Sequence, residues 1–373
     1  MNIRAAVLRE PRAPVRTETV QLEPPSAAEV LVRVAAAGVC RSDLHFAEGV
    51  VGDGRWPMVL GHEGAGVVEA VGPGVEHVAP GDRVVFCIVP ACGTCRPCRS
   101  GRPNLCEPAG VASLRGTLLD GTSRLRVNGT ILQHCLLTSC FAAAAVVPAA
   151  GAIPIGEDVP LWQAALLGCG VVTGFGAVRN TARVRSGDSV CVVGCGGVGL
   201  HVVAAARLAA ASKIVAVDRE PAKLEVALQR GATDAVVASE DAAAAVRERT
   251  DGGVDHAFEV VGLAETIRLA WDSLRPGGSV VVVGLAPTGV EVSVPAIEFL
   301  SEKAILGSYY GSGNVAADLP GLVRLVCEGR LDLADVVSHL TDLDGVEAAL
   351  ERLRRGEGTR TVVVLDADLA QVP

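Results

Sequence analysis

The glycine-rich segment 194–199 lies between two short apolar stretches, and this arrangement restricts the fold more than any other feature of the 373-residue chain. Residues 189–193 have the composition of a buried strand, and the spacing G-x-G-x-x-G follows directly. A helical run then extends to about residue 210, and a second strand, 214–217, ends at Asp218. The order strand, glycine motif, helix, strand and acidic residue predicts a unit that binds a dinucleotide.

Glycine has no side chain, so the backbone of this motif could approach a pyrophosphate at the helix N-terminus, where free N–H groups favour an anion. Asp218 would accept hydrogen bonds from a ribose 2′-OH and would repel a 2′-phosphate, which predicts NAD as the cofactor. Arg219 could instead pair with that phosphate if Asp218 turned away, so NADP remains the alternative. The predicted pyrophosphate contacts are Gly194, Gly196, Gly197, Val198 and Gly199.

The alternation of strands and helices continues beyond Asp218, which predicts an α/β fold with a doubly wound parallel sheet. We expect helices at 221–231, from 241 and at 264–274, strands at 235–237, 254–259, 279–283 and 304–308, and a turn at 276–278. Helices near 318–328 and 344–355 and a strand at 361–365 do not extend this pattern. The length predicts two domains. We expect a first domain of residues 1–170 and 306–373, and a dinucleotide-binding domain of residues 171–305.

The first part of the chain has mainly β character, with strands expected at 6–8 and 30–34. Cys40 and His45 belong to a polar segment that directly follows a strand, where functional groups are often displayed. His62 and Glu63 share a glycine-rich turn, and a neutral imidazole is the commonest metal ligand. With Cys169, these residues could supply a Cys2His set that leaves one metal position open. Spacing alone does not show that three such distant segments converge.

Four cysteines with the spacing C-x2-C-x2-C-x7-C form the strongest metal-binding signal in the chain, because four thiolates can close a tetrahedron around Zn²⁺. An iron-sulfur cluster is the competing prediction. Zinc is favoured, since the ferredoxin spacing with its following proline is absent. The four residues are Cys92, Cys95, Cys98 and Cys106. The other cysteines are interpreted as small buried hydrophobic residues, namely Cys87, Cys135, Cys140, Cys191, Cys195 and Cys327.

The formal net charge of −9 argues against nucleic acid or an anionic membrane as a partner. An uncharged stretch at 127–156 contains polar residues and prolines, so it is interpreted as buried sheet and connections. Charges near the N-terminus interrupt any apolar segment of the kind that a signal peptide needs. Twelve cysteines without a secretory signal are typical of a reducing compartment, so we predict a cytoplasmic protein.

Taken together, these motifs resemble those of the zinc-dependent medium-chain alcohol dehydrogenases over essentially the whole chain. The matching segments are 40–45, 61–72, the four-cysteine lobe, 168–170, the glycine motif with Asp218, and 358–361. The resemblance implies a Rossmann domain and a mainly β, GroES-like catalytic domain with a zinc-binding lobe. It implies a catalytic zinc on Cys40, His62 and Cys169, with Glu63 close to the metal and Asp43 orienting His62. It also implies a structural zinc on Cys92, Cys95, Cys98 and Cys106, giving two zinc ions per chain.

The chemistry that the resemblance implies is reversible hydride transfer between an alcohol and NAD, with the alcohol oxygen polarised at the catalytic zinc. It suggests that the proton leaves through Ser42, the cofactor ribose and then His45, whose ordinary pKa is near neutral. The remaining implied cofactor contacts are Arg41 and Arg360 at the pyrophosphate, Thr173 on the nicotinamide side and Lys223 at the adenosine ribose.

The substrate-channel positions implied by the resemblance are aliphatic or small, which predicts a roomy apolar pocket for medium or bulky primary or secondary alcohols. They are Ile88, Val111, Cys135, Leu136, Leu285 and Ile305. A thiol-dependent formaldehyde dehydrogenase is the nearest alternative, but residues 107–110 lack the arginine expected to bind the thiol's carboxylate. Two further alternatives are a biosynthetic carbonyl or imine reductase and a non-catalytic nucleotide-binding protein. A non-catalytic nucleotide-binding protein would not need a set of metal ligands with an open position.

The segment 116–129 is long and resembles the dimeric branch of the family, in contrast to tetrameric members with a shorter loop. We therefore expect a homodimer that acts on a small-molecule alcohol or aldehyde.

Overall fold

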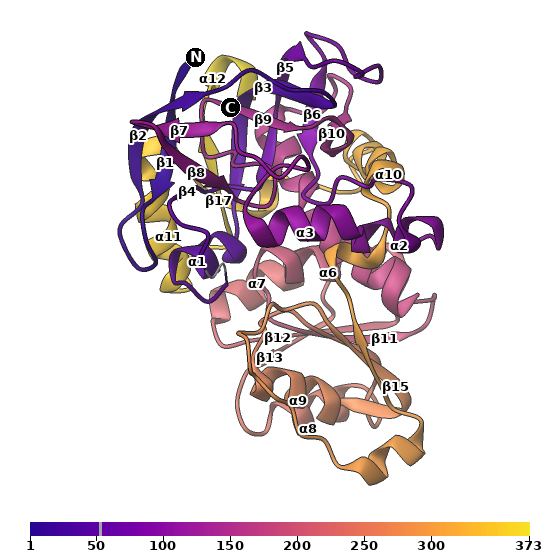
Figure 1. Ribbon diagram of the computed structural model, residues 1–373. Coiled ribbons are helices and arrows are strands. Elements are labelled where there is room, and N and C mark those ends of the chain that lie inside the picture. The colour runs from indigo at the N-terminus through magenta and orange to yellow at the C-terminus, as the bar shows by residue number, and fades with distance from the viewer. Residues whose placement is uncertain (52–53) are drawn as a thin grey trace. The chain divides into compact units, whose positions relative to one another are not determined.

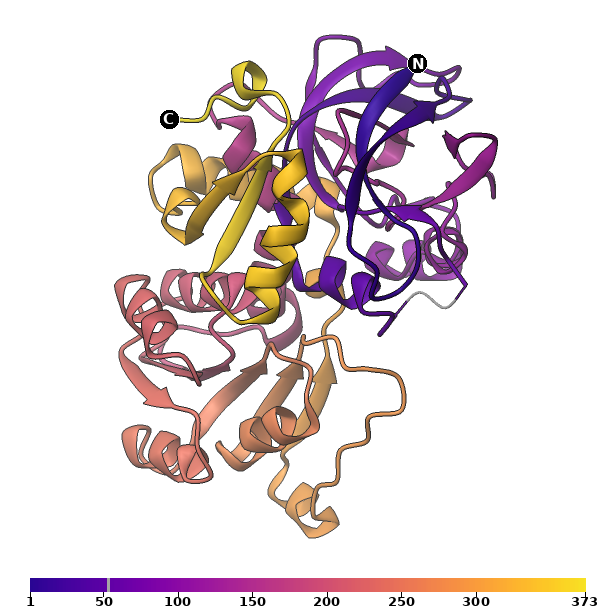
Figure 2. The same ribbon diagram turned by 90° about the vertical axis from the view of Figure 1, so that its left-hand side faces the viewer.

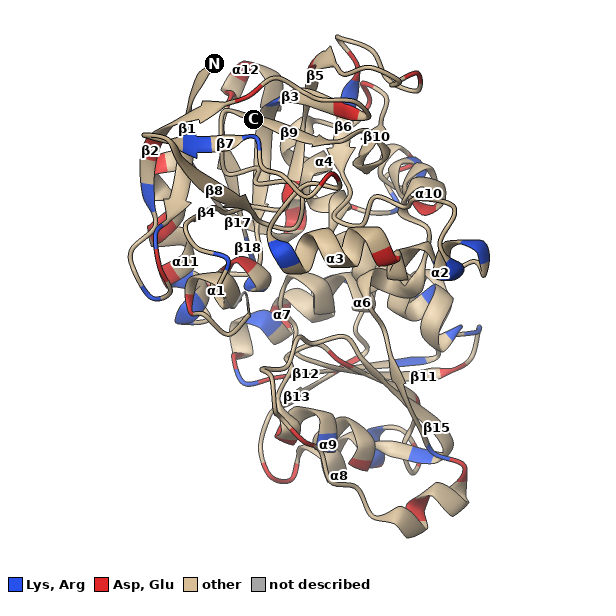
Figure 3. Cartoon of the chain, viewed as in Figure 1, with Lys and Arg blue, Asp and Glu red and all other residues tan. Residues whose placement is uncertain are grey.

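The computed structural model describes residues 1–51 and 54–373, which form two compact units (Figure 1). Unit 1 consists of Met1–Cys169 and Asn314–Pro373, and unit 2 consists of Gly170–Gly313. Figure 3 shows acidic and basic residues interspersed over the elements of each unit. In the described part of the chain, no single helix is long and apolar enough to cross a membrane, and one bent pair, 161–168 with 170–182, reaches that length only in combination.

Unit 2 contains a six-stranded parallel sheet with the order β13-β12-β11-β14-β15-β16, which confirms the predicted doubly wound topology. Its strands are rich in valine and largely buried, as expected where helices cover both faces of a sheet. The strands are β11 (Ser189–Val193), β12 (Lys213–Asp218), β13 (Asp234–Val237), β14 (Val254–Glu259), β15 (Leu274–Val282) and β16 (Ala304–Gly307). The helices are α5 (Gly170–Gly176), α6 (Gly197–Leu208), α7 (Pro221–Gln229), α8 (Ala242–Arg249) and α9 (Ala264–Asp272).

The turn predicted at 276–278 is wrong, because these residues lie within strand β15. Gly277 does adopt a positive φ of 79°, as a turn residue would. The strand nevertheless continues to Val282, and the pairing of β15 with β14 shifts its register between Val254 and His256. A local irregularity therefore produced the turn signal without ending the strand.

Unit 1 is built from two β structures. The first is a closed barrel of β1 (Asn2–Leu8), β2 (Arg16–Leu22), β7 (Leu125–Val127), β8 (Thr130–His134) and β4 (Met58–Val59). The second is a sheet of β10 (Ala152–Pro154), β6 (Arg83–Phe86), β5 (Glu63–Val71), β3 (Glu29–Val39), β18 (Arg360–Val364) and β17 (Val337–Thr341), with β9 (Ala144–Pro148) also paired to β3. The uncharged stretch at 127–156 supplies β8, β9 and β10, as interpreted from its composition.

The C-terminal segment returns to unit 1 and completes its larger sheet. Strand β18 pairs antiparallel with β3, so residues from the end of the chain lie beside the strand that precedes Cys40. Figure 2 shows this yellow strand and the helix α11 (Val346–Arg354) against the N-terminal part of the chain. The other helices of unit 1 include α1 (Arg41–Ala47), α2 (Arg96–Arg99), α3 (Glu107–Arg115), α4 (Leu161–Ala164), α10 (Val315–Cys327) and α12 (Ala367–Ala370).

Candidate active site

Four buried side chains from three distant segments converge in unit 1. Cys40, His62, Glu63 and Cys169 each offer a ligand atom, and these atoms all lie within 4.8 Å of one another. Cys40 follows the end of β3, His62 and Glu63 stand at the start of β5, and Cys169 follows a short 3-10 turn at Ala165–Gly168. The fold thus brings together the residues whose convergence the spacing could not establish.

Asp43 connects the segments that carry Cys40 and His62. Its Oδ1 lies 3.0 Å from His62 Nδ1 and accepts a hydrogen bond from Gly61 N at 3.2 Å. Its Oδ2 accepts one from Cys40 N at 2.9 Å. A carboxylate at Nδ1 fixes the imidazole orientation and directs the opposite nitrogen towards a metal. This is the geometry expected of a residue that orients His62.

The donor atoms of this cluster fit a divalent metal such as zinc. His62 Nε2 and Glu63 Oε1 are buried and have no hydrogen-bond partner among the described residues. The Cys169 thiol donates a hydrogen bond that lowers the pKa of Cys40, while the same contact and burial raise the pKa of Cys169. Burial opposes a charge on His62, but Asp43 and the two thiols raise its pKa above the usual value. A bound cation replaces such protons.

Glu63 lies between the metal-binding cluster and a buried arginine. Its Oε2 accepts a hydrogen bond from Arg360 Nη2, and both side chains are almost completely excluded from solvent. Sequence reasoning placed Glu63 beside the metal and Arg360 at the pyrophosphate. The structure shows that the Arg360 guanidinium is paired with Glu63, which supplies the counter-charge that a buried carboxylate needs.

The residues predicted to carry the proton lie on α1, directly after Cys40. Ser42 Oγ is 3.9 Å from Cys40 Sγ, and His45 follows one helical turn later on the same side of the helix. Partial burial and then the neighbouring Arg41 lower the pKa of His45. His45 Nδ1 has no partner among the described residues, and Arg41 is exposed, with its Nη1 donating to Leu353 O at 3.3 Å. The proton-carrying roles remain predictions.

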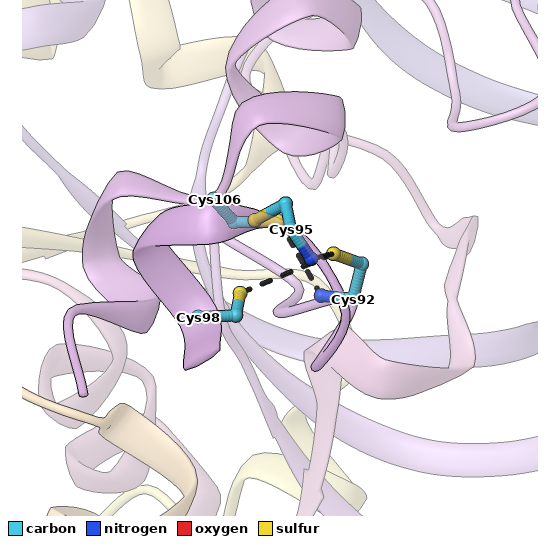
Figure 4. Close-up of side chains that lie close together, drawn as sticks. All are labelled: Cys92, Cys95, Cys98 and Cys106. Carbon is cyan, nitrogen blue, oxygen red and sulfur yellow. Dashed lines mark hydrogen bonds between the residues drawn. The ribbon is translucent and has the colours of Figure 1, made fainter. Parts of the chain in front are cut away.

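The four cysteines predicted to bind a structural zinc form a second cluster, with their sulfur atoms within 4.8 Å of one another (Figure 4). Cys95 and Cys106 precede the helices α2 and α3, so two helix N-termini face the thiols. The backbone N–H of Cys95 donates a hydrogen bond to Cys92 Sγ at 3.3 Å. The backbone N–H of Cys92 donates one to Cys106 Sγ, also at 3.3 Å. Hydrogen bonds from Thr94 and from backbone lower the pKa of Cys92 to about 6, whereas burial raises the pKa of Cys98 to about 12 and also raises that of Cys106.

The interpretation of the remaining cysteines is correct with one exception. Cys87, Cys135, Cys140, Cys191 and Cys195 are buried, whereas Cys327 near the end of α10 is exposed. No disulfide joins the twelve cysteines, all of which lie in the described part of the chain. The apolar run around Cys327 supports a helix whose buried face does not include this residue.

The glycine motif of unit 2 has the geometry of a nucleotide cradle. Gly194 adopts a φ of 97°, and a Cβ atom on Gly199 would collide with the carbonyl oxygen of Gly194. A Cβ on Gly196 would instead meet open space, where a pyrophosphate could approach the N-terminus of α6. Gly197 and Val198 form the first turn of that helix. The glycines therefore differ in the space around them, and their contacts with a pyrophosphate remain predictions.

Asp218 is the last residue of β12 and is hydrogen-bonded to the glycine motif. Its Oδ2 accepts a hydrogen bond from Cys195 N at 2.7 Å, and its Oδ1 accepts one from Glu220 N at 2.9 Å. Arg219 points into solvent and lies 3.4 Å from a carboxylate oxygen of Glu220. Asp218 is thus held by two backbone amides, whereas the Arg219 side chain is exposed, and their contacts with a ribose remain predictions. Thr173 on α5 and Lys223 on α7 are half-buried.

The residues predicted to line the substrate channel are distributed over both units. Ile88 and Cys135 are buried in unit 1, with Cys135 Sγ close to His62 and Asp43. Leu136 is half-buried and has a positive φ of 48°. Val111 on α3, Leu285 after β15 and Ile305 on β16 are exposed. Their assignment to one pocket remains a prediction.

Sequence reasoning missed the loop that supports the His62 segment. Ser139 Oγ accepts a hydrogen bond from Cys135 N at 3.0 Å and donates one to Val59 O at 2.9 Å. Thr138 Oγ1 donates to Gly61 O at 3.1 Å. Leu136, Leu137 and Ser139 all have positive φ, a conformation that β-branched and bulky residues rarely adopt. No local sequence pattern signals such a loop.

Comparison with known proteins relates both units to dehydrogenases. Residues 26–157 match the family described as the alcohol dehydrogenase GroES-like domain, and residues 197–328 match the family described as zinc-binding dehydrogenase. The S-(hydroxymethyl)glutathione dehydrogenases of Photobacterium damsela subsp. piscicida and of a Synechocystis strain are 40% and 39% identical over 97% of this chain and 100% of their own length.

Solved structures give the same relationship. An alcohol dehydrogenase zinc-binding domain protein from Burkholderia ambifaria has a TM-score of 0.93 and 36% identity. The benzyl alcohol dehydrogenase of Acinetobacter calcoaceticus has a TM-score of 0.92 and 34% identity. Each comparison covers 98% of this chain and 99% of the other.

Proposed function

Because the chain belongs to the zinc-dependent medium-chain alcohol dehydrogenases, an NAD-linked family of oxidoreductases, we propose that it interconverts medium or bulky apolar alcohols with the matching aldehydes or ketones. The observation that carries this proposal is the buried set of Cys40, His62 and Cys169, three donors that leave a metal position open for an alcohol oxygen. A non-catalytic nucleotide-binding protein has no use for such a set.

The four-cysteine spacing left zinc and an iron-sulfur cluster as alternatives, and membership of this family favours zinc. At the catalytic site, zinc supplies a Lewis acid that polarises the alcohol oxygen. The chain's own part is to hold the donors in place: Asp43 fixes the His62 ring and the Cys40 backbone together. Burial of all three donors excludes bulk water from the reacting oxygen.

Ser42 and His45 are the groups proposed to move the alcohol proton towards solvent. Ser42 lies beside Cys40, and its hydroxyl can both accept and donate a proton. His45 is half-buried on the same helix, and its lowered pKa favours the neutral imidazole that can accept the proton. The path through these residues supports catalysis near neutral pH.

The apolar nature of the substrate is proposed from the side chains around the donor set. Cys135 lies close to His62 and Asp43, Ile88 is buried in the same unit, and both side chains are uncharged residue types. The cation Arg55, which packs beside α3, donates to Ser113 O at 2.6 Å and stacks 5.1 Å from the centroid of the Phe46 ring. These contacts occupy its guanidinium, so we expect Arg55 not to bind a charged group of the substrate.

A second candidate substrate is the S-hydroxymethyl adduct of a thiol, as in the curated relatives named above. The overall identity to these relatives favours it. The segment Glu107–Gly110 opposes it, because it provides an acidic side chain and no cation for a carboxylate of the thiol. Both candidates carry a CH–OH group at the reacting end and differ in what is attached to it.

We expect benzyl alcohol and octanol to show kcat/KM at least about tenfold above that of ethanol, since each buried methylene adds roughly 0.8 kcal/mol of binding. NADH formation is measured for these alcohols and for S-(hydroxymethyl)glutathione. Gly110→Arg is the matched variant: it adds the cation that the segment 107–110 lacks, at a position where a side chain meets open space. It should favour the glutathione adduct over the apolar alcohols. Turnover confined to ethanol overturns the proposal, and turnover confined to the glutathione adduct establishes the second candidate.

We further propose that the protein is a homodimer, paired through strand β16. This strand forms one edge of the six-stranded sheet, and Ile305 and Leu306 on it are exposed. The adjoining segment Ala296–Ser301 exposes Ile297, Phe299 and Leu300, the last at 81%. An exposed apolar edge strand is a template for pairing with a second copy. We also propose a cytoplasmic location, because a reducing compartment keeps free thiols from forming disulfides.

The dimer predicts a particle of about twice the 38.1 kDa chain mass in sedimentation or light scattering. Leu306→Lys is expected to yield monomers, because it places a charge on the paired edge. Val237→Lys at the opposite edge, on β13, is the control and should leave the dimer intact. A monomeric parent protein, or equal effects of the two variants, would contradict pairing through β16.

A further inference from the structure

Gly38 lies at the point where three strands of unit 1 carry the metal-binding cluster. It is the second residue before Cys40 on β3, and it stands opposite Glu63 on β5 and opposite Val362 on β18. Residues that face each other across a sheet direct their side chains to the same face, and so do residues two apart on one strand. Glu63 and Arg360 therefore extend from the two flanking strands to the same face of β3.

The space above Gly38 is filled by the ion pair of those two residues. A Cβ atom at position 38 would approach Glu63 Oε2 more closely than real Cβ atoms approach an oxygen. It would also lie 3.0 Å from Arg360 Nη2 and 3.0 Å from Leu166 Cδ2. The carboxylate and the guanidinium thus occupy the volume in which any other residue would place its side chain.

The Glu63 carboxylate contacts Arg360 and also belongs to the metal-binding cluster. One of its oxygens belongs to the group of ligand atoms within 4.8 Å of one another, with Cys40, His62 and Cys169. Arg360 donates to Oε2, and Oε1 has no partner among the described residues. Both side chains are almost completely excluded from solvent, so we expect a carboxylate displaced from above Gly38 to move towards the metal position.

We infer that Gly38 is a positioning residue that keeps the Glu63 carboxylate away from the open metal position, by leaving room for its ion pair with Arg360. This inference rests on the proposed metal-dependent activity and deepens it. The open position must stay free for the alcohol oxygen, and a carboxylate is an effective zinc ligand. The lack of a side chain at residue 38 therefore leaves the open metal position to the alcohol oxygen and not to the Glu63 carboxylate.

The test uses the Gly38→Ala enzyme with Co²⁺ at the catalytic site and imidazole as an added ligand. In the parent protein, imidazole should change the visible cobalt spectrum. In the variant, the affinity for imidazole should fall by about ten- to a hundredfold, the usual size of an effect on metal-site support. The KM for the alcohol should rise with kcat less affected. The spectrum reports on the metal position whichever alcohol is the substrate. A wrong substrate assignment would therefore leave the spectral result for Gly38→Ala unchanged.

Two second-site changes separate this role from ordinary packing. Glu63→Asp in the Gly38→Ala background shortens the carboxylate and should restore imidazole binding. Leu166→Ala in the same background relieves only the apolar contact and should not restore it. Thermal unfolding of each variant identifies loss of fold. Unchanged imidazole affinity in a folded Gly38→Ala protein, or rescue by Leu166→Ala instead of Glu63→Asp, overturns the inference.

Discussion

Replacing Cys169 with serine is expected to lower alcohol oxidation by more than about a hundredfold while the protein stays folded. Changes around metal ligands commonly cost 10- to 100-fold, and the loss of a direct ligand should cost more. Serine has no thiolate at neutral pH, so the open site keeps only Cys40 and His62 from its donor set. The measurement combines NADH formation with metal analysis, in which the zinc content should fall from about two ions per chain to about one.

Cys140→Ser is the matched control, because Cys140 is a buried thiol of the same unit outside both predicted zinc-binding sets. It should keep both metals and most of the activity. Full zinc content and full turnover in Cys169→Ser would show that Cys169 is not a ligand.

Replacing Cys92 with serine is expected to have its largest effect on stability. The four-cysteine lobe depends on the metal for its fold, since it consists of short helices and turns and three of its four thiols are only partly buried. A structural zinc contributes directly to folding free energy, so its loss should lower the melting temperature by at least about 5 °C. Differential scanning calorimetry and zinc analysis of the same sample provide the measurement.

Cys327→Ser offers a control at an exposed thiol and should leave both the melting temperature and the zinc content unchanged. The two zinc predictions also differ in kind. Loss of Cys169 should remove activity at constant stability, whereas loss of Cys92 should remove stability first. If Cys92→Ser melted at the parent temperature with both metals bound, the cluster would not hold a structural ion.

The fold of unit 2 could be predicted from the sequence because its signals are local. The strands β11 to β14 are each followed by an α-helix within a few residues, so the boundaries of these elements were placed within a few positions. The motif Gly194 to Gly199 then specified which strand comes first. The one incorrect turn, at 276–278, came from glycines that bend a strand without ending it.

The candidate metal site was predictable only in part, because its residues are joined by non-local contacts. Spacing revealed the four-cysteine cluster, but the grouping of Cys40, His62 and Cys169 depended on the family resemblance. The pairing of Glu63 with Arg360 joins residues 297 positions apart, and no periodicity relates them. The space at Gly38 was likewise invisible in sequence, since a glycine in a strand has several possible causes.

The position of β18 in the middle of a sheet has a consequence for how the protein is made. Residues 36–38 of β3 pair with β5 on one edge, but on the other edge residues 36–39 pair with residues 361–364 of β18. While the chain is still on the ribosome, this half of β3 has an unpaired edge, and Glu63 lacks its cation. The pair of Glu63 with Arg360 can therefore form only after residue 360 has been made, whereas the ligand residues Cys40, His62 and Cys169 are all made well before it.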